Sequence, residues 1–467
     1  MLRLRGSPTP QPLLSPSSLN LGTSASRLFL AVFAAVLGNF NFGYSLVYSS
    51  PVLPKLKSPD ADPRLRMDTT QAAWFGSIYM LGAAAGGLGA MLLNDMLGRK
   101  LSILMSAVPS TIGWGSQTCV LGPLRVLHCE FFTIVNVCPV YISEISHKAV
   151  RGALGSCPQI TAVFGALSLY ALGLVLPWRW LAVVGEVPAL LMVMLLVFMP
   201  RSPRRLLSLG KKEQAEKALR WLRGNNYDTH IELHAIQLGT PVYYRPIIIS
   251  VVMRFLQQMT GITPVLVYLE PIFAQSKVSL EYDAALVGAV RLFSVAIAAF
   301  LMDKAGRKAL LYTSSMLMFL STLTLTMNAN TTHCPPGPTP TNATVILSYT
   351  SLGKCLLIRY AMGWGPITWL LMSEVLPLVA RGVASGLCVT VSWLTAFGLT
   401  YAFTHLVDRY GLYVPYLCFM VVCVLCILFN ALCIPETRSR SLEEIENYFR
   451  TGRTFTINRS HSSVQPS

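Results

Sequence analysis

The chain has 467 residues, of which 53% are hydrophobic and 12% are charged, and its mean hydropathy is +0.52. This balance excludes an ordinary soluble globular protein and predicts a membrane protein. The formal net charge of +16 would suit a nucleic-acid-binding protein. The basic residues, however, collect in alternate loops between long apolar runs and at both termini, as membrane topology requires, so we expect no nucleic-acid partner.

Twelve apolar runs are long enough to cross a bilayer as a helix, which takes about 20 residues. They cover approximately residues 28–48, 72–93, 101–118, 121–142, 153–176, 178–199, 247–273, 283–301, 309–327, 345–371, 384–406 and 411–433. Runs of this length predict helices rather than strands, because a helix satisfies its own backbone in lipid. The predicted fold class is an all-α membrane protein.

The polar segment 201–246 divides these runs into two sets of six. The first set follows a basic N-terminal tail, and a basic tail also follows the last run, so both termini and the dividing segment are predicted to be cytosolic. The expected domains are a tail (1–27), a six-helix bundle (28–200), a linker (201–246) with a short amphipathic helix from Lys211 to Arg223, a second six-helix bundle (247–434) and a tail (435–467).

Two motifs occur once in each half. The sequence Asp-Met-Leu-Gly-Arg-Lys at 95–100 returns as Asp-Lys-Ala-Gly-Arg-Lys at 303–308, which is 208 positions later. An acid also precedes an arginine by seven residues in each half, as Glu144 with Arg151 and as Glu374 with Arg381. Two motifs in the same order predict a duplicated membrane domain, which is typical of transporters that hold their substrate between the halves.

The stretch around residues 330–342 predicts an external loop. Asn330-Thr-Thr and Asn342-Ala-Thr are N-glycosylation sequons in a segment without charged residues. Catalytic signals are missing, since the chain shows neither a metal-ligand spacing of His, Cys and carboxylates nor a phosphate-binding loop or nucleophile elbow. Cys423 and Cys426 lie within an apolar run, where packing is the better interpretation. We therefore expect neither an enzyme nor a cofactor.

The motifs together resemble the sugar porter family of the major facilitator superfamily. The resemblance rests on the two repeated motifs, on Pro435-Glu436-Thr437 and on the segment 257–263 (Gln-Gln-Met-Thr-Gly-Ile-Thr). Segments 39–44, 178–182 and 363–369 further resemble the class III facilitative glucose transporters. The resemblance covers about residues 28–455, and it implies twelve helices in two six-helix bundles, alternating access and facilitative transport of a hexose.

A hexose is neutral and covered with hydroxyl groups, so its site needs amide side chains and aromatic faces. Gln159, Gln257 and Gln258 lie inside apolar runs, where a buried amide indicates either a cavity or a hydrogen bond between helices. Gly261 and Pro264 weaken the helix beside the pair. The resemblance implies these sugar-binding residues: Gln159, Gln257, Gln258, Thr263, Trp369 and Trp393.

The repeated charged residues are expected at the cytosolic ends of helices. Charge-assisted pairs there would close an inner gate and separate when it opens; the alternative is that these charges only set the topology. The expected gate residues are Arg99, Glu144, Arg151, Arg204, Arg307, Glu374, Arg381 and Glu436, to which the resemblance adds Tyr268.

The chain also departs from the family. Arg291 places a cation at the expected depth of the cavity, and the pattern of the fourth span is absent from residues 111–138. These changes leave the hexose undefined and keep two alternatives open: a proton-coupled symporter and a non-transporting sugar sensor. The intramembrane carboxylate with the clearest claim to a proton is Glu186, whereas the family's symporters carry an acid near Gly43-Tyr44, where Ser45 stands here.

Leu13 and Leu14 resemble a dileucine signal that endocytic sorting adaptors bind, although the usual acidic residue upstream is missing and a chance pair is the alternative. The expected location is an endosomal or lysosomal membrane, with the plasma membrane as the alternative. The expected partners are therefore the lipid bilayer, a hexose and sorting adaptors.

Overall fold

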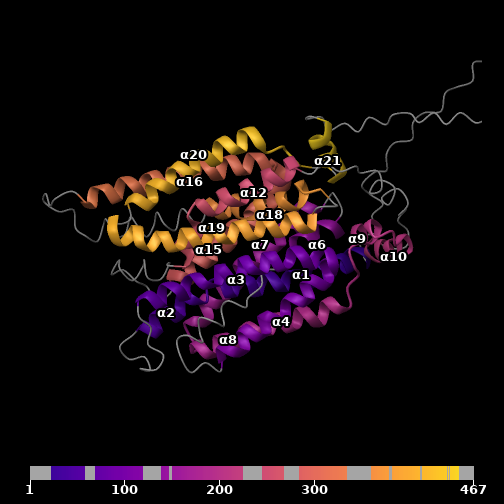
Figure 1. Cartoon of the computed structure of the whole chain (residues 1–467), viewed down its shortest axis with the longest axis horizontal. Coiled ribbons are helices and arrows are strands. Elements are labelled where there is room, and N and C mark those ends of the chain that lie inside the picture. Colours follow the sequence, from indigo (N-terminus) through magenta and orange to yellow (C-terminus); the bar gives the residue numbers. More distant parts are fainter. Residues whose placement is uncertain are drawn as a thin grey trace, which may run out of the picture.

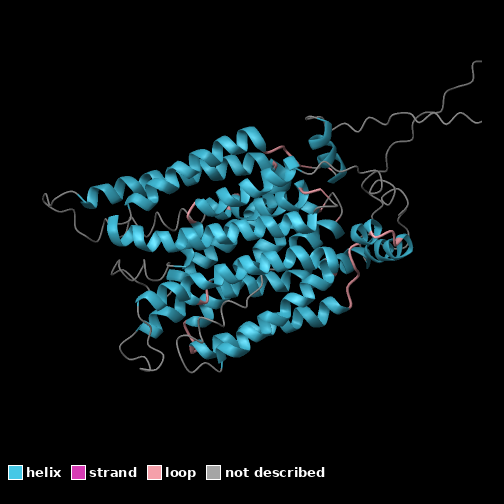
Figure 2. Cartoon of the chain, in the orientation of Figure 1, coloured by secondary structure: helices cyan, strands magenta, loops and turns pink. Residues whose placement is uncertain are grey.

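The computed structural model describes residues 23–57, 69–118, 138–146, 150–223, 244–267, 283–333, 359–377, 381–410, 413–438, 440 and 442–451. Within these ranges every regular element is a helix (Figure 2). Each of the twelve predicted apolar runs overlaps at least one of the helices. The described part of the fold is therefore all-α, as the sequence predicts, and its helices form two bundles.

The first bundle contains the N-terminal helices. They are α1 (Thr23–Leu46), α2 (Ser49–Lys57), α3 (Thr69–Met96), α4 (Arg99–Thr118), α6 (Cys138–Ile145), α7 (Arg151–Gly173) and α8 (Trp178–Val197). Two short helices follow, α9 (Pro203–Ser208) and α10 (Lys212–Arg223). Within this bundle α1 packs on α7 and α8, and α4 packs on α8.

The second bundle repeats this arrangement. It contains α12 (Tyr244–Met259), α13 (Ile262–Val267), α15 (Asp283–Ala305), α16 (Arg307–His333), α18 (Trp364–Val375), α19 (Arg381–Tyr410) and α20 (Tyr413–Cys433), and α21 (Leu442–Thr451) follows it. The contact of α16 with α20 corresponds to that of α4 with α8, as expected from the sequence repeat.

The bundles meet along two helix pairs. α3 packs against α19, and α7 packs against α15 (Figure 1). The two pairs are equivalent by the sequence repeat. α15 in the second half corresponds to α3 in the first half, and α19 corresponds to α7. A pair of related contacts of this kind lets one bundle rock against the other about the region between them.

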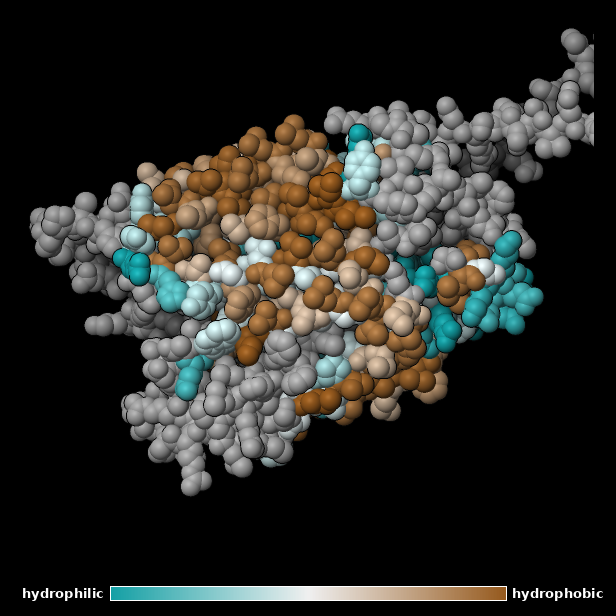
Figure 3. All heavy atoms as spheres, in the orientation of Figure 1, coloured by the Kyte–Doolittle hydropathy of each residue, from teal (hydrophilic) through white to brown (hydrophobic). Residues whose placement is uncertain are grey.

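The outer surface is apolar over most of its length. Exposed hydrophobic side chains cover the helices in Figure 3, while hydrophilic ones lie at both ends of the bundle, with a large group over α9 and α10. Leu92, Phe198 and Leu432 are all more than half exposed. Of the described helices, seven regions are long and apolar enough to span a membrane, in α1, α3, α8, α15, α16, α19 and α20. Such a surface fits lipid as its surroundings.

The repeated Gly-Arg-Lys motif forms a sharp junction between two helices in each half. Gly98 lies between α3 and α4 with φ +83, and Gly306 lies between α15 and α16 with φ +92. Residues with a Cβ rarely adopt this backbone conformation. The conformation explains why both copies of the motif carry glycine. We call the end of the molecule with these two junctions, α9 and α10 the charged end.

The predicted amphipathic helix is confirmed as α10. Its buried side chains, Ala215, Leu219 and Leu222, recur at helical spacing. They face α9 and α1, on which α10 packs. Ser202 caps α9, since its hydroxyl accepts a hydrogen bond from the backbone N–H of Arg205 and Pro203 follows at the first helical position. The linker thereby begins as a folded element against the first bundle.

The structure changes two of the predicted boundaries. The seventh apolar run is not one helix, because α12 ends at Met259 and α13 starts at Ile262. The ninth run extends further than predicted, so that α16 reaches His333 and includes the backbone of Asn330 in its last turn. The side chain of Asn330 lies outside the described residues, as do Asn342, Leu13 and Leu14, and their predicted glycosylation and sorting roles stay predictions.

The break between α12 and α13 depends on Gly261. Its φ is +80, and a Cβ there would collide with the ring of Phe419. Replacing Gly261 with alanine should therefore destabilise the protein by about 1–3 kcal/mol, through backbone strain and displacement of the ring. Thermal unfolding of the purified variant in detergent measures the effect.

Gly398→Ala is the matched control, because Gly398 lies within α19 and a Cβ there has open space around it. This variant should be as stable as the parent or more stable, since alanine favours helix. Equal melting temperatures for Gly261→Ala and Gly398→Ala would contradict the structural role of Gly261.

Candidate functional site

A polar cavity lies between the two bundles. It measures ≈ 50 Å³ and is lined from both halves, by residues of α1 and α7 on one side and of α12, α13, α15 and α19 on the other, together with Tyr360 and Trp369. This volume holds a few water molecules and is well below the roughly 300 Å³ at which small-molecule pockets begin. The cavity as it stands is therefore too small for a sugar, and the bundles have to move to accommodate one.

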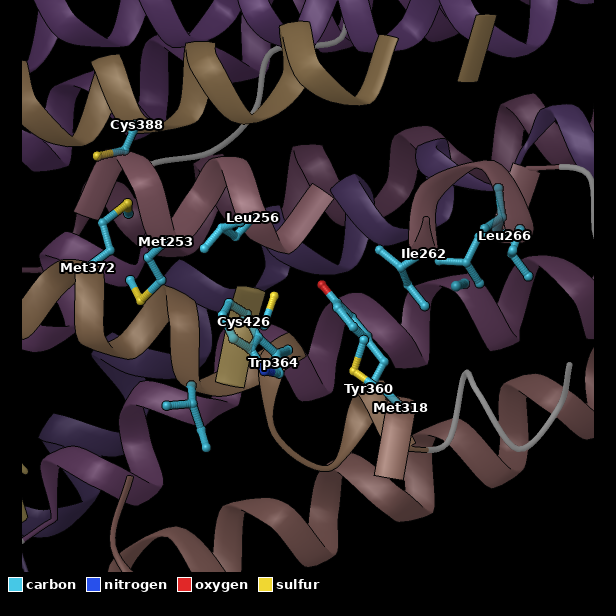
Figure 4. Close-up of a cluster of buried hydrophobic side chains, with 14 of the residues drawn as sticks. Met253, Leu256, Ile262, Leu266, Met318, Tyr360, Trp364, Met372, Cys388 and Cys426 are labelled. Carbon is cyan, nitrogen blue, oxygen red and sulfur yellow. The ribbon is translucent and has the colours of Figure 1, made fainter. Parts of the chain in front are cut away.

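Gln257 joins α12 to the segment that leads into α18. Its Nε2 donates to the hydroxyl of Tyr360 at 2.6 Å and to the carbonyl oxygen of Trp364 at 2.8 Å. Figure 4 shows Tyr360 and Trp364 close to Met253 and Leu256 of α12, in the apolar cluster around the break. The helix of the tenth span begins again only after Gly363. Gln257 thus supports an irregular backbone beside the cavity, as such segments require at membrane depth.

Gln258 links three helices. Its Nε2 donates to Ser392 Oγ of α19 at 2.9 Å, and its Oε1 accepts from Thr263 Oγ1 of α13 at 2.6 Å. All three side chains are at least nine-tenths buried. The amide therefore holds both sides of the break together, and its hydrogen bonds offer the alternating donors and acceptors that match hydroxyl groups.

Aromatic rings complete the cavity. Trp393 of α19 lies edge-on to Phe42, with ring centroids 5.7 Å apart, and to Tyr79 at 6.1 Å. Its indole Nε1 is buried and has no hydrogen-bond partner among the described residues. A buried indole N–H normally has a partner. This donor at the cavity wall is therefore available to a ligand.

The structure brings the six predicted sugar-binding residues to one place. Gln159, Gln257, Gln258, Thr263, Trp369 and Trp393 all line this cavity, and binding of a sugar by them stays a prediction. Arg291 lines it too, at the depth that the sequence indicated. Sequence reasoning missed Arg254, Tyr360 and Phe42. For Arg254 the available signal was a cation inside the apolar run 247–273, three residues before Gln257.

The charged end contains a buried ion-pair cluster. Glu144 of α6 accepts from Arg99 Nε at 3.1 Å and from the hydroxyl of Ser202. Arg381, at the start of α19 in the other bundle, places Nη1 3.8 Å from the same carboxylate. Glu144 is 3% exposed. One buried carboxylate therefore ties the two halves together at this end.

The second half contains the equivalent arrangement. Glu374 of α18 lies 3.6 Å from Arg307 and accepts from the Thr437 hydroxyl at 2.8 Å. Glu436 accepts from the backbone N–H groups of Arg307 and Lys308, at 3.1 and 3.0 Å. Its carboxylate thus caps the N-terminus of α16, where a negative charge is stabilising.

The other expected gate residues take different positions. Arg204 of α9 is 7% exposed at the same end. The backbone of Arg151 begins α7, but its side chain is outside the described part of the chain, and so is all of Tyr268. The structure thus places seven of the eight predicted charged residues at the charged end as buried or capping groups, while their role in gating stays a prediction.

Two related helical bundles, a polar cavity between them and a buried ion-pair cluster at one end define a membrane transporter. The family profile described as "Sugar (and other) transporter" matches residues 30–449. The chain therefore belongs to the sugar transporter family of the major facilitator superfamily.

Curated relatives resemble the chain over nearly its whole length. It is 55% identical over 459 residues to solute carrier family 2, facilitated glucose transporter member 6, of Mus musculus, covering 91% of this chain and 92% of the relative. It is 52% identical to the Homo sapiens protein of the same name, with the same two coverages. It is also 39% identical to member 8 of Mus musculus, covering 94% and 98%.

Solved structures share the fold. The proton:xylose symporter XylE bound to 6-bromo-6-deoxy-D-glucose superposes with a TM-score of 0.77 at 26% identity, covering 91% of this chain and 99% of that one. The inward open conformation of XylE from E. coli has a TM-score of 0.67 at 26% identity, covering 90% and 99%.

Replacing Glu144 with glutamine should loosen the charged end. The change removes the anion that both Arg99 and Arg381 approach, and removing one partner of a buried pair costs about 3–5 kcal/mol. Cys388, which is 0% exposed and lies about two turns after Arg381 in α19, reports the opening. Labelling of Cys388 by a polar thiol reagent, followed by mass spectrometry, should become at least roughly tenfold faster.

Glu216→Gln is the control, because Glu216 forms an exposed pair with Arg220 on α10, and exposed pairs contribute little. The same labelling rate in Glu144→Gln as in the parent and in Glu216→Gln would show that the carboxylate does not hold this end closed.

Proposed function

We propose that the chain is a facilitative hexose transporter that works by alternating access. The observation that carries the proposal is the meeting of Gln159 from the first bundle with Gln258 and Trp393 from the second at a single cavity. Amides and an indole N–H suit the hydroxyl groups of a neutral sugar, and the aromatic rings suit its apolar faces. A site shared by both halves is available to either side of the membrane as the halves rock.

In this proposal the charged end is cytosolic and forms the inner gate. The excess of Lys and Arg in the linker 201–246 and in the tails supports this orientation. Arg381 and Glu144 belong to different halves, so opening of the gate separates them, whereas Arg99 and Glu144 can stay together within the first half. The inner gate is then a two-state contact whose loss allows sugar to reach the cytosol.

We favour uniport over proton-coupled transport. Proton coupling is the alternative because XylE, one of the similar solved structures, is a proton:xylose symporter. Among the described residues no carboxylate lines the cavity. Ser45 stands where the family's symporters carry an acid, and its hydroxyl donates to the Asn41 carbonyl oxygen at 2.9 Å. Glu186 of α8 does not line the cavity, but both of its carboxylate oxygens are buried without a hydrogen-bond partner among the described residues, so it is the carboxylate at which coupling has to be tested.

We propose an endosomal or lysosomal membrane as the location, on the basis of the dileucine sequence Leu13-Leu14. A dileucine signal of this kind directs a transporter to endosomal or lysosomal membranes through sorting adaptors, and the plasma membrane is the alternative location. The third functional alternative is a sugar sensor. Such a protein would bind sugar in the same cavity but would not carry it across the membrane.

Gln258→Leu should weaken hexose binding by about 1–3 kcal/mol, because the ligand and Thr263 both lose a polar partner. Equilibrium exchange of labelled glucose into proteoliposomes gives the change in apparent affinity. Gln214→Leu is the matched control, since Gln214 lies exposed on α10. Equal affinity in the two variants, with both proteins correctly folded, would remove Gln258 from the sugar site.

A pH gradient should not drive accumulation of sugar. Proteoliposomes with equal glucose on both sides and an imposed pH gradient are expected to show exchange without net uptake, because no titratable acid lines the cavity within the described residues. Net uptake that disappears in Glu186→Gln would establish coupling instead. Binding of glucose without any exchange would identify a sensor.

A further inference from the structure

Two arginines lie in the middle of the second bundle and line the central cavity. Arg254 is in α12 and Arg291 is in α15. Their exposed fractions are 1% and 7%. Burying a cation at membrane depth is expensive unless an anion or a set of hydrogen-bond acceptors compensates it. The partners of these two guanidinium groups therefore decide what the cavity can bind.

Arg254 is only partly satisfied. Its Nη1 donates to Gln257 Oε1, and its guanidinium lies over the ring of Trp369, with Cζ 3.7 Å from the ring centroid. Nε and Nη2 are buried without a hydrogen-bond partner among the described residues. These two donors form one edge of the planar group, which is the edge that grips a carboxylate or phosphate with two parallel hydrogen bonds.

Arg291 adds a second cation to the same cavity. Its Nε is also buried and has no hydrogen-bond partner in the described part of the chain. The lining residues include neutral amides, hydroxyls and aromatic rings, but no acid within the described ranges. The cavity thus carries two positive charges without a counter-charge on its wall.

Other buried arginines of the chain differ in this respect. Arg99 and Arg381 both approach Glu144, and Arg307 approaches Glu374, each within 4.0 Å. Each of these three buried arginines at the charged end therefore has a carboxylate beside it. Among the described residues no carboxylate lines the cavity with Arg254 and Arg291, which points to an anion that arrives with the ligand.

We propose that the central cavity takes a sugar that carries an anionic group, either a carboxylate or a phosphate. The open edge of Arg254 and the Nε of Arg291 hold the oxyanion, while Gln258 and Trp393 hold the hydroxyl groups. This inference rests on the proposed function, because it assigns a substrate class to the same cavity. A bound carboxylate neutralises one of the two buried charges and a phosphate dianion neutralises both, whereas a neutral hexose leaves both in place.

The position of Arg254 adds a second reason for this preference. Its guanidinium covers Trp369 and occupies the acceptor of Gln257, which are two of the groups that a neutral sugar would use. A neutral hexose has to displace a hydrogen-bonded cation and gains no charge interaction in return. An anionic sugar makes use of the cation where it stands, through charge-assisted hydrogen bonds that are stronger than neutral ones.

Competition experiments on the full-length protein in proteoliposomes test the inference. Exchange of labelled glucose is measured against unlabelled glucose, glucuronate, glucose 6-phosphate and inorganic phosphate, and thermal stabilisation by each compound provides a readout that does not need transport. Glucuronate or glucose 6-phosphate should inhibit at concentrations at least about tenfold lower than glucose does. The more potent of the two identifies the carboxylate or the phosphate.

Variants assign the preference to the arginines. Arg254→Gln and Arg291→Gln should each lose the roughly tenfold advantage of the anionic sugar over glucose, measured as the ratio of the two inhibitory concentrations within each variant. Arg254→Lys, which keeps the charge without the two-donor edge, should lose part of it. Arg245→Gln is the matched control, because Arg245 is exposed at the start of the same helix, and it should keep the full preference.

The outcomes separate the inference from the proposed function. If glucose is exchanged and unlabelled glucose inhibits that exchange as strongly as both anionic sugars or more strongly, the anion site is overturned. The proposed hexose transporter is then unaffected. Inorganic phosphate as potent as glucose 6-phosphate would also overturn it, since the site would then take a separate anion. If no sugar is exchanged and no sugar stabilises the protein, both proposals are rejected.

Discussion

A polar group buried at membrane depth must find its partner inside the protein, because the lipid offers none. The buried polar residues that follow this constraint lie in two regions, the charged end and the central cavity. At the charged end the carboxylates of Glu144 and Glu374 compensate buried arginines. At the centre the amides of Gln257 and Gln258 support the break between α12 and α13 and the irregular start of α18. Most of the surface between is apolar and faces lipid.

The charged residues of the sequence repeat make contacts both within each half and between the halves. Within each half an arginine that follows the motif glycine lies beside the acid of the second motif, and a hydroxyl from the following segment, Ser202 or Thr437, bonds the same acid. These contacts fix each half internally. The contact of Arg381 with Glu144 at 3.8 Å is longer than that of Arg99 with Glu144 at 3.1 Å, and it joins the halves. The weaker, shared contact is therefore the one suited to break when the bundles rock.

Much of this arrangement could be predicted from local sequence. The apolar runs indicated every described bundle helix except α2, which lies between two runs. The spacing of the motifs indicated the two halves, and amides inside apolar runs indicated a cavity that all three glutamines line. The position of Gly261 beside Pro264 also indicated a weakened helix, and the break occurs there. Signals of this kind depend on residues close in the sequence and on the cost of burying them.

What could not be predicted depends on register between the bundles. The sequence motif joins Arg381 to Glu374, but the position of Arg381 beside Glu144 follows from the packing of α19 and α18 against the first bundle. The stacking of Arg254 on Trp369 joins residues 115 positions apart, and a cation in a run gives no sign of which ring it meets. The extension of α16 through Asn330 was missed because threonine and asparagine in its last turns interrupt the apolar pattern.

The central claim is that the cavity between the bundles is the sugar site. It is tested most directly by an electron cryomicroscopy structure of the full-length protein in lipid nanodiscs with saturating sugar. The account predicts ligand density in contact with Gln258 and Trp393, with Gln159 completing the site from the other bundle. An unchanged empty cavity at saturating sugar, or density bound only elsewhere in the molecule, would contradict it.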